Sequence, residues 1–520
     1  MTRLFATLSA SVALAGCSLA PTYVRPAPPV PNSWPVGDAY LRQSEAALPS
    51  VSYRDIFRDR RLQALIDQAL ANNRDLRVAV ANIEATRAQY RIQRGDLFPQ
   101  VNATGAYSYR ESSRSGVNTG INTGTGAGGT GTGGTGTGGV GTGGTGPGTG
   151  GTGGVGTTVV SGSNSTFQAQ LGLTAFEIDL FGRVRSLTGA ALSRYFAQEA
   201  AARATRLTLI GDLATAWLNY AADQSLLTVA EQTAVAARAS VRLTDARRRG
   251  GVSPRTDVRQ AEQILATAEA DLAEQRTLLA QDINAIQLLV GAPVDRALLP
   301  GGIEQAAQAI GELPAGIDSG VLLRRPDVVQ AEYSLRAFNA EIGAARAALF
   351  PRITLTGLVG FASTALRTLF SGDSFNWSVA PGISYPIFRA GAGRAGVDYS
   401  VAQRDAALAN YEVTIQGAFR EVSDALARRG TISEQLAANQ RFYTAAVDTL
   451  NLTNARYRGG IDTYLTSLDA QRQLYSAQRT LVQTQLVRAA NLVTLYRTLG
   501  GDSLLDVTDD GPRPVPVGGK

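Results

Sequence analysis

The stretch that decides the fold runs from Leu452 to Leu499 and opens with LTNARYRGGIDTYLTSLDAQRQLYSAQ. It reads as the end of a helix, a break at a Gly-Gly pair, and then a second long helix. An earlier stretch, which begins LTDARRRGG at Leu243, repeats it at a constant offset of 209 residues. Self-similarity at a fixed offset indicates a duplicated architecture. The sequence therefore predicts two similar halves, each with a helix–turn–helix tip.

A second pair of matches precedes the tips. DLFPQV at Asp96–Val101 corresponds to ALFPRI at Ala348–Ile353, here at an offset of 252 residues. The first half therefore carries extra residues, and these form the Gly/Thr-rich segment 116–156. Such a segment buries too little apolar surface to offset its ordering entropy, so we expect a flexible extracellular loop between two strands.

The composition excludes several kinds of active site. Histidine is absent, and Cys17 is the single cysteine. The chain therefore has no means of forming an internal disulfide, a His/Cys metal site, or a Ser–His–Asp or Cys–His catalytic group. Carboxylate-only catalysis stays open, but no constellation of residues demands it, so we predict neither an enzyme nor a cofactor. The net charge of +6 is modest. Without a basic run interleaved with aromatics, we predict no nucleic-acid binding.

The N-terminus predicts export and lipidation. The apolar run LFATLSASVALAG ends directly before Cys17, which is typical of a signal peptide over residues 1–16. The four residues LAGC at 14–17 resemble a bacterial lipobox, which implies acylation of Cys17. The alternative is an ordinary signal peptide followed by a chance cysteine. Pro21–Pro35 is rich in proline and predicts an extended strap leading away from the anchor.

Alternating apolar and polar residues predict four strands, near 98–110, 166–179, 351–362 and 376–388. Strands of about ten residues with one apolar face are typical of transmembrane β-strands, although any one of them could instead belong to a buried sandwich. Long helices are predicted over 186–249, 254–290, 395–457 and 463–499. The longest would extend about 95 Å. No apolar run of 18 residues follows the signal peptide, so we do not expect these helices to cross a membrane.

Four strands cannot close a barrel, and an open sheet edge is not viable in lipid. Three chains would supply twelve strands, an even number such as barrels prefer. The helices are far longer than the ~30 Å core of a bilayer, so they must project into the periplasm and pack laterally into a tube. The predicted fold class is mostly α with membrane β. It is a trimeric α-barrel/β-barrel duct, in which each chain gives four transmembrane strands and long coiled-coil helices in two structural repeats.

The predicted organisation has five parts. They are a signal peptide (1–16), a lipidated N-terminal strap (17–60), a first structural repeat (61–300), a second structural repeat (301–501) and a disordered C-terminal tail (502–520).

Four stretches resemble a known family. They are FEIDLFGRVRS at Phe176–Ser186, RRPDVVQAE at Arg324–Glu332, IGAARAALFPRITL at Ile342–Leu355 and RYRGGIDTYLTSLDAQRQLYSAQ at Arg456–Gln478. They are similar to the TolC-type outer-membrane efflux proteins, in particular the lipoprotein (NodT-type) branch that serves resistance–nodulation–division (RND) pumps. The resemblance extends from Cys17 to Gly501, and only segment 116–156 departs from it.

This resemblance implies a homotrimeric channel in the outer membrane, lipid-anchored through Cys17. It would be the exit duct of a tripartite pump for drugs or other small toxic solutes. Its partners would be an inner-membrane RND-type transporter and a periplasmic membrane-fusion adaptor. One alternative is the duct of a type I protein secretion system, which the lipobox and the RRPD segment disfavour. Another is a non-conducting structural surface lipoprotein. A passive porin is disfavoured because most of the chain is helical.

The resemblance also implies a gate at the periplasmic tip. Leu465, Asp469 and Arg472 match family positions that line the constriction, and their i, i+4, i+7 spacing places them on one helix face. Threefold symmetry would turn each into a ring, with Leu465 as an apolar constriction and Asp469 as a cation-attracting neck. Alternatively, Asp469 and Arg472 form only a surface ion pair.

Two further sets of residues match family positions at the tips. Tyr457 and Asp257 match positions that tie the helix pairs together in a closed channel, but Asp462 stands where some relatives have Arg, so that latch does not carry over unchanged. The Gly-Gly turns are predicted to dock the adaptor, with simple helix C-caps as the alternative. Their residues are Gly250, Gly251, Gly459 and Gly460.

Overall fold

The computed structural model describes residues 18–37, 39–40, 52–112, 162–312 and 319–516. The predicted signal peptide, Cys17 and segment 116–156 lie outside these residues. The chain divides into two compact units. The helical unit comprises Met1–Phe98, Asp179–Arg352 and Ser384–Lys520, and the strand unit comprises Pro99–Ile178 and Ile353–Ile383.

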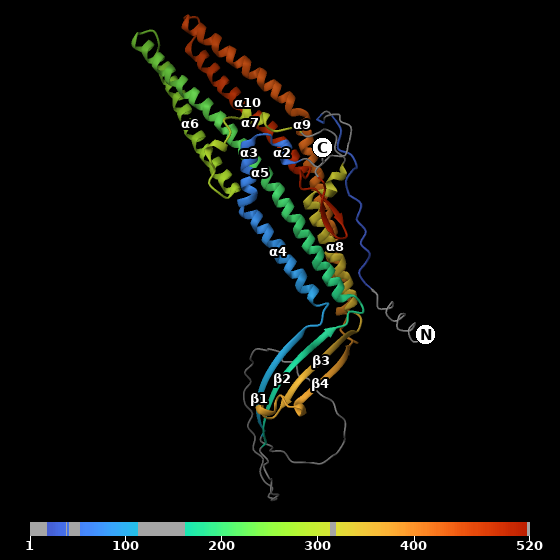
Figure 1. The fold of residues 1–520 in the computed structure, drawn as a ribbon. Helices are drawn as coiled ribbons and strands as arrows, with labels where there is room; N and C mark the ends of the chain where they lie inside the picture. The colour runs from blue at the N-terminus through green and yellow to red at the C-terminus, as the bar shows by residue number, and fades with distance from the viewer. Residues whose placement is uncertain (1–17, 38, 41–51, 113–161, 313–318, 517–520) are drawn as a thin grey trace, which may run out of the picture. The chain divides into compact units, whose positions relative to one another are not determined.

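The helical unit is built on two very long helices. Both α5 (Arg183–Arg249) and α9 (Ala392–Arg458) contain 67 residues, which corresponds to about 100 Å at 1.5 Å per residue. Each pairs with the helix that follows its tip, α6 (Arg255–Val290) or α10 (Tyr464–Thr498). Figure 1 shows these two hairpins, which we call the α5/α6 hairpin and the α9/α10 hairpin. The equal lengths of α5 and α9 are what a duplicated sequence predicts.

Shorter helices pack beside the long ones. They are α2 (Tyr53–Ile56), α3 (Arg60–Asn72), α4 (Arg74–Gly95), α7 (Ile303–Gln308) and α8 (Pro326–Ala347), with 3-10 turns η1 (Arg296–Leu298) and η2 (Ser319–Arg324). Helix α4 packs against α5, and α8 packs against both α5 and α9. Among the described residues, none of the helices combines the length and apolarity that a membrane crossing requires.

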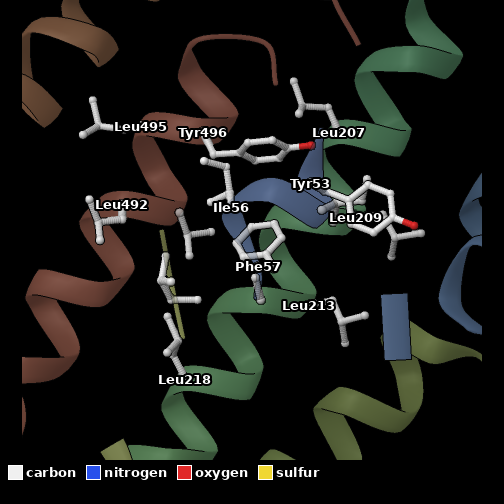
Figure 2. Close-up of a cluster of buried hydrophobic side chains, with 14 of the residues drawn as sticks. Tyr53, Ile56, Phe57, Leu207, Leu209, Leu213, Leu218, Leu492, Leu495 and Tyr496 are labelled. Atoms are coloured by element: carbon white, nitrogen blue, oxygen red, sulfur yellow. The ribbon is translucent and has the colours of Figure 1, made fainter. Parts of the chain in front are cut away.

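The main core lies where α2 and α3 meet α5 and α10. Figure 2 shows Phe57 between α5, which carries Leu213, and α10, which carries Tyr496. The rings of Phe57 and Tyr496 meet edge-on at 5.3 Å between centroids. Trp217 is fully buried, and its indole N–H donates to the Leu298 carbonyl at 3.2 Å. This cluster holds the first-repeat and second-repeat helices together far from their tips.

The N-terminal strap contacts α8 and α9 closely. Asn339 Nδ2 donates to the Pro21 carbonyl at 2.8 Å, and Trp34 stacks on Phe419 with centroids 4.9 Å apart. Between these contacts, Arg25 pairs with Glu332 at 2.9 Å, and the Glu332 side chain is 0% exposed. A buried charge is tolerated only when it is paired, so Arg25 fixes the strap on the helices.

The expectation of a disordered tail over 502–520 is wrong for the part of the tail that the structure describes. Strands β5 (Leu505–Thr508) and β6 (Gly511–Pro514) form an antiparallel hairpin. Leu505 is buried beside Ala197 and Tyr333, and Tyr333 Oη donates to the Thr508 carbonyl at 2.8 Å. The hairpin is ordered because Leu505 covers an apolar surface that only the folded helices create.

The strand unit is one four-stranded sheet with the order β1-β2-β3-β4, in which β2 pairs antiparallel with both β1 and β3. Its strands are β1 (Val101–Ser112), β2 (Gly162–Glu177), β3 (Arg352–Ser363) and β4 (Phe375–Ser384), and short turns η3 (Leu366–Thr368) and η4 (Gly372–Ser374) join β3 to β4. Tyr107 lies opposite Phe167, and their rings approach to 4.7 Å. The pairing of β2 with β3 is interrupted between Leu173 and Phe176 by a bulge.

Candidate functional site

The three predicted gate residues share one exposed face of α10. Leu465 is 57% exposed, and Asp469 and Arg472 are also exposed. The opposite face is buried through Tyr464 and Leu468. The spacing therefore predicted the common face correctly, because α10 is a regular helix packed along its other side.

Asp469 and Arg472 do not pair with each other. Asp469 Oδ2 instead accepts a hydrogen bond from Gln473 Nε2, one turn further along, at 3.1 Å. Within the ranges that the structure describes, no ion pair joins Asp469 to Arg472. Both charged side chains therefore remain accessible on the exposed face. In a threefold trimer, the copies from the three protomers could lie close together there.

Tyr457 lies at the contact between the two hairpins. It is 6% exposed and packs beside Tyr464 and Leu468 against Ala261 of α6. The Arg247 guanidinium of α5 stacks over the Tyr457 ring at 4.5 Å from its centroid. A cation over an aromatic face contributes about 0.5–2 kcal/mol, depending on its exposure to water. Tyr457 thus joins the hairpins through its ring.

The structure does not bring Asp257 to Tyr457. Asp257 Oδ2 accepts from Ser253 Oγ at 2.6 Å, within the first tip. The Tyr457 hydroxyl is buried and has no hydrogen-bond partner among the described residues. The partner of Tyr457 across the hairpins is therefore Arg247, which the sequence did not single out because a stacked cation leaves no spacing signature.

Asp462 has a local role at the second tip. Both of its oxygens accept from Arg456, from Nε at 2.6 Å and from Nη2 at 3.0 Å. This hydrogen bonding lowers the pKa of the Asp462 carboxyl. Because Arg456 lies in the last turn of α9, the pair braces the turn at the second tip.

Both Gly-Gly turns are helix C-caps of the same design. At the first tip, Val252 N–H donates to the Arg247 carbonyl at 3.0 Å, and Gly251 has φ +77°. At the second tip, Ile461 N–H donates to the Arg456 carbonyl at 2.9 Å, and Gly460 has φ +73°. This is the Schellman arrangement, which requires a left-handed residue. A Cβ at either left-handed glycine would meet no described atom within 4 Å, so the outer surface of each turn is open.

One contact between the hairpins was not foreseen. Tyr475 Oη of α10 donates to Asp271 Oδ2 of α6 at 2.9 Å. Burial, and then this hydrogen bond, raises the pKa of Tyr475 to about 12. The helical spacing of Tyr464, Leu468 and Tyr475 signals a packed face. The identity of the partner depends on how the two hairpins align.

The comparisons with known proteins agree with this geometry. Residues 65–292 and 319–501 match the family described as outer membrane efflux protein. The chain belongs to the outer membrane efflux protein family. It is 42% identical over 490 residues to the probable efflux pump outer membrane protein TtgC of Pseudomonas putida, covering 94% of this chain and 93% of TtgC. It is 38% identical to the outer membrane protein OprJ of Pseudomonas aeruginosa, covering 94% of each.

A solved structure of a family member matches as well. The open state of the MtrE outer membrane channel of Neisseria gonorrhoeae aligns with a TM-score of 0.76 at 33% identity, over 93% of this chain and 98% of MtrE. This efflux protein is therefore an outer-membrane channel protein of the same fold. Its relatives are efflux proteins rather than enzymes. Among the residues that the structure describes, no group of three or more acidic, cysteine or histidine side chains could hold a metal ion.

Proposed function

We propose that this efflux protein is the gated exit duct of a tripartite pump for drugs or other small toxic solutes. The observation that carries the proposal is that a single chain contains both a four-stranded sheet and two helical hairpins, each with one 67-residue helix. The sheet supplies the wall of a membrane barrel, and the helices supply a periplasmic tunnel. A duct of this kind requires no cofactor and no catalytic group.

The sheet edges support a trimer. Among the residues that the structure describes, β1 and β4 each have a neighbouring strand on one side only. On β4, Trp377 is 69% and Ile383 72% exposed, and Tyr107 of β1 is also exposed. Exposed aromatic and apolar side chains suit a strand that faces lipid, but unpaired backbone groups do not. If β1 of each copy paired with β4 of the next copy, three copies would close a barrel of twelve strands.

The open face of α10 supports a gate in this trimer. Leu465, Asp469 and Arg472 are exposed in the single chain and would meet their symmetry copies at the axis. A ring of Asp469 carboxylates would favour cations, and a ring of Leu465 side chains would narrow the bore. MtrE, a relative, has been solved in an open state. Opening in this protein would be a shift of the hairpins between two packings.

The tips support docking of a periplasmic adaptor, which would link the duct to an inner-membrane RND-type transporter. Each Gly-Gly turn leaves open space and presents one exposed apolar residue, Val252 or Ile461. Two tips of the same design would offer equivalent docking points around the tunnel. Acylation of Cys17, which precedes the N-terminal strap in the sequence, would anchor the protein to the outer membrane.

The proposal is tested by efflux in cells. Deleting the gene is expected to increase the accumulation of a fluorescent efflux substrate such as ethidium, and the wild-type gene supplied in trans is expected to restore export. Unchanged accumulation in the deletion strain, with the wild-type strain shown to contain the trimer in its outer membrane, would contradict the exit-duct function.

A further inference from the structure

We propose that Tyr475 and Asp271 fasten the two helical hairpins together, and that opening the gate requires this hydrogen bond to break. The inference rests on the proposed gate and adds to it a pair of residues outside the predicted ring. Neither Tyr475 nor Asp271 belongs to the tip turns or to the exposed face of α10 that carries Asp469.

The contact is a hydrogen bond from a phenol to a carboxylate. Tyr475 Oη lies 2.9 Å from Asp271 Oδ2, with one residue from each structural repeat. A hydrogen bond to an ionised acceptor is stronger than a neutral one. Arg479, one turn further along α10, lies over the Tyr475 ring at 5.6 Å from its centroid and helps to hold the ring in place. Burial raises the pKa of Tyr475 to about 12, further above neutral pH, so the phenol keeps the proton that it donates.

The fastening lies next to the candidate gate. Tyr475 follows Arg472 by three residues, so the two side chains are neighbours on the helix surface. It follows Asp469 by six residues, which is about 9 Å along the axis. Tyr475 is half-buried, at the border between the packed face of α10 and its exposed face. A movement of α10 that displaces the ring of Asp469 residues therefore also displaces Tyr475.

The other contacts between the hairpins near the tips are mainly apolar. Tyr457, Tyr464 and Leu468 pack on Ala261 and its neighbours through apolar contacts, which have little directional preference, and the Arg247 guanidinium lies over the Tyr457 ring. The hydrogen bond between Tyr475 and Asp271 is directional and fails once donor and acceptor separate by more than about 0.6 Å beyond the present 2.9 Å. Helix shifts of about 1–2 Å are typical of switching transitions. A helix shift of this size would therefore break the hydrogen bond, so the bond would be present in one packing of the hairpins and absent in the other.

The test is a double-mutant cycle on single-channel currents of the purified full-length trimer in planar bilayers. The proteins are wild type, Tyr475→Phe, Asp271→Ala and the double variant. Tyr475→Phe keeps the ring and removes only the donor. We expect it to raise the open-to-closed ratio about tenfold, which corresponds to about 1.4 kcal/mol. The double variant should show no further increase, because both substitutions remove the same bond. Asp271→Asn keeps an acceptor oxygen and should restore most of the closed population.

Two references complete the design. Tyr399→Phe, at an exposed tyrosine of α9, should behave as wild type. The Asp469→Ala/Arg472→Ala variant reports whether the ring is a gate. If that variant opens the channel and Tyr475→Phe does not, the proposed role of the Tyr475–Asp271 hydrogen bond is wrong, but the proposed gate is retained. Additive effects of the two single substitutions, or a loss of trimer stability without a change in the ratio, would also overturn the fastening. If the ring variant does not differ from wild type, the proposed gate fails, and the fastening fails with it.

Discussion

The strap should detach when Arg25 is removed. Glu332 is 0% exposed, and Arg25 contacts both of its oxygens, at 3.1 Å and 2.9 Å. Removing one partner of a buried ion pair costs about 3–5 kcal/mol when the remaining charge is left uncompensated. Here Arg336 still donates to Glu332 at 3.2 Å, and Arg25 is 37% exposed. We therefore expect Arg25→Ala to weaken strap docking by a smaller amount, about 2 kcal/mol, in the range of a hydrogen bond to a charged group.

Native-state proteolysis measures this local opening. Chymotrypsin can cleave after Tyr23 only when the strap leaves the helices, because Tyr23 lies under Arg336. When opening is fast compared with cleavage, the rate follows the open population. A loss of about 2 kcal/mol should accelerate cleavage roughly 30-fold.

A matched control variant removes an arginine from an exposed ion pair, and so shows whether the effect depends on the burial of the pair. Arg54 pairs with Asp67 at 3.2 Å, but both side chains are about half exposed. Surface pairs contribute about 0–1 kcal/mol, so Arg54→Ala should leave strap cleavage unchanged. Cleavage of Arg25→Ala at the wild-type rate would refute the reasoning, because it would mean that the buried Glu332 does not hold the strap.

Two further predictions concern the helical unit. Burial, and then the charge of Asp223, raises the pKa of Asp282 to about 7 from an ordinary value of 3.8. The folded chain thus binds this proton more tightly than the unfolded chain, so Asp282 should lower the free energy of unfolding progressively as pH rises from about 4 to 7. Asp282→Asn should raise the thermal midpoint at pH 8 but not at pH 4, as followed by circular dichroism; an equal shift at both would contradict it. Leu505→Ala should lower the free energy of unfolding by about 2–3 kcal/mol because Leu505 is buried, whereas Val36→Ala, at an exposed site, should change it by under about 0.5 kcal/mol. Equal unfolding midpoints for these two variants would show that the C-terminal hairpin adds no stability.

The sequence predicted the long elements well because local signals specify them. The repeat at a fixed offset and the absence of proline within 183–249 and 392–458 set the length of α5 and α9. The Gly-Gly pairs marked both helix ends, since only glycine readily adopts the left-handed φ found at Gly251 and Gly460. The alternation of side chains placed all four strands of the sheet.

Contacts between distant segments could not be predicted in the same way. Pairing of Tyr475 with Asp271, and of Arg247 with Tyr457, depends on how two hairpins align, and this alignment has no periodic signal in either segment. The tail was misinterpreted for a related reason. Its prolines and glycines are typical of disorder, but Leu505 becomes ordered because α5 and α8 present an apolar surface to it.

Single-channel conductance of the purified protein, with wild type measured beside Asp469→Ala/Arg472→Ala, tests the gated duct most directly. The account predicts a small or flickering wild-type current that becomes large and steady in the variant, because the exposed face of α10 would lose its charged rings. A large, steady wild-type current would contradict the gate. The absence of current from both proteins, with the trimer confirmed, would contradict the duct itself.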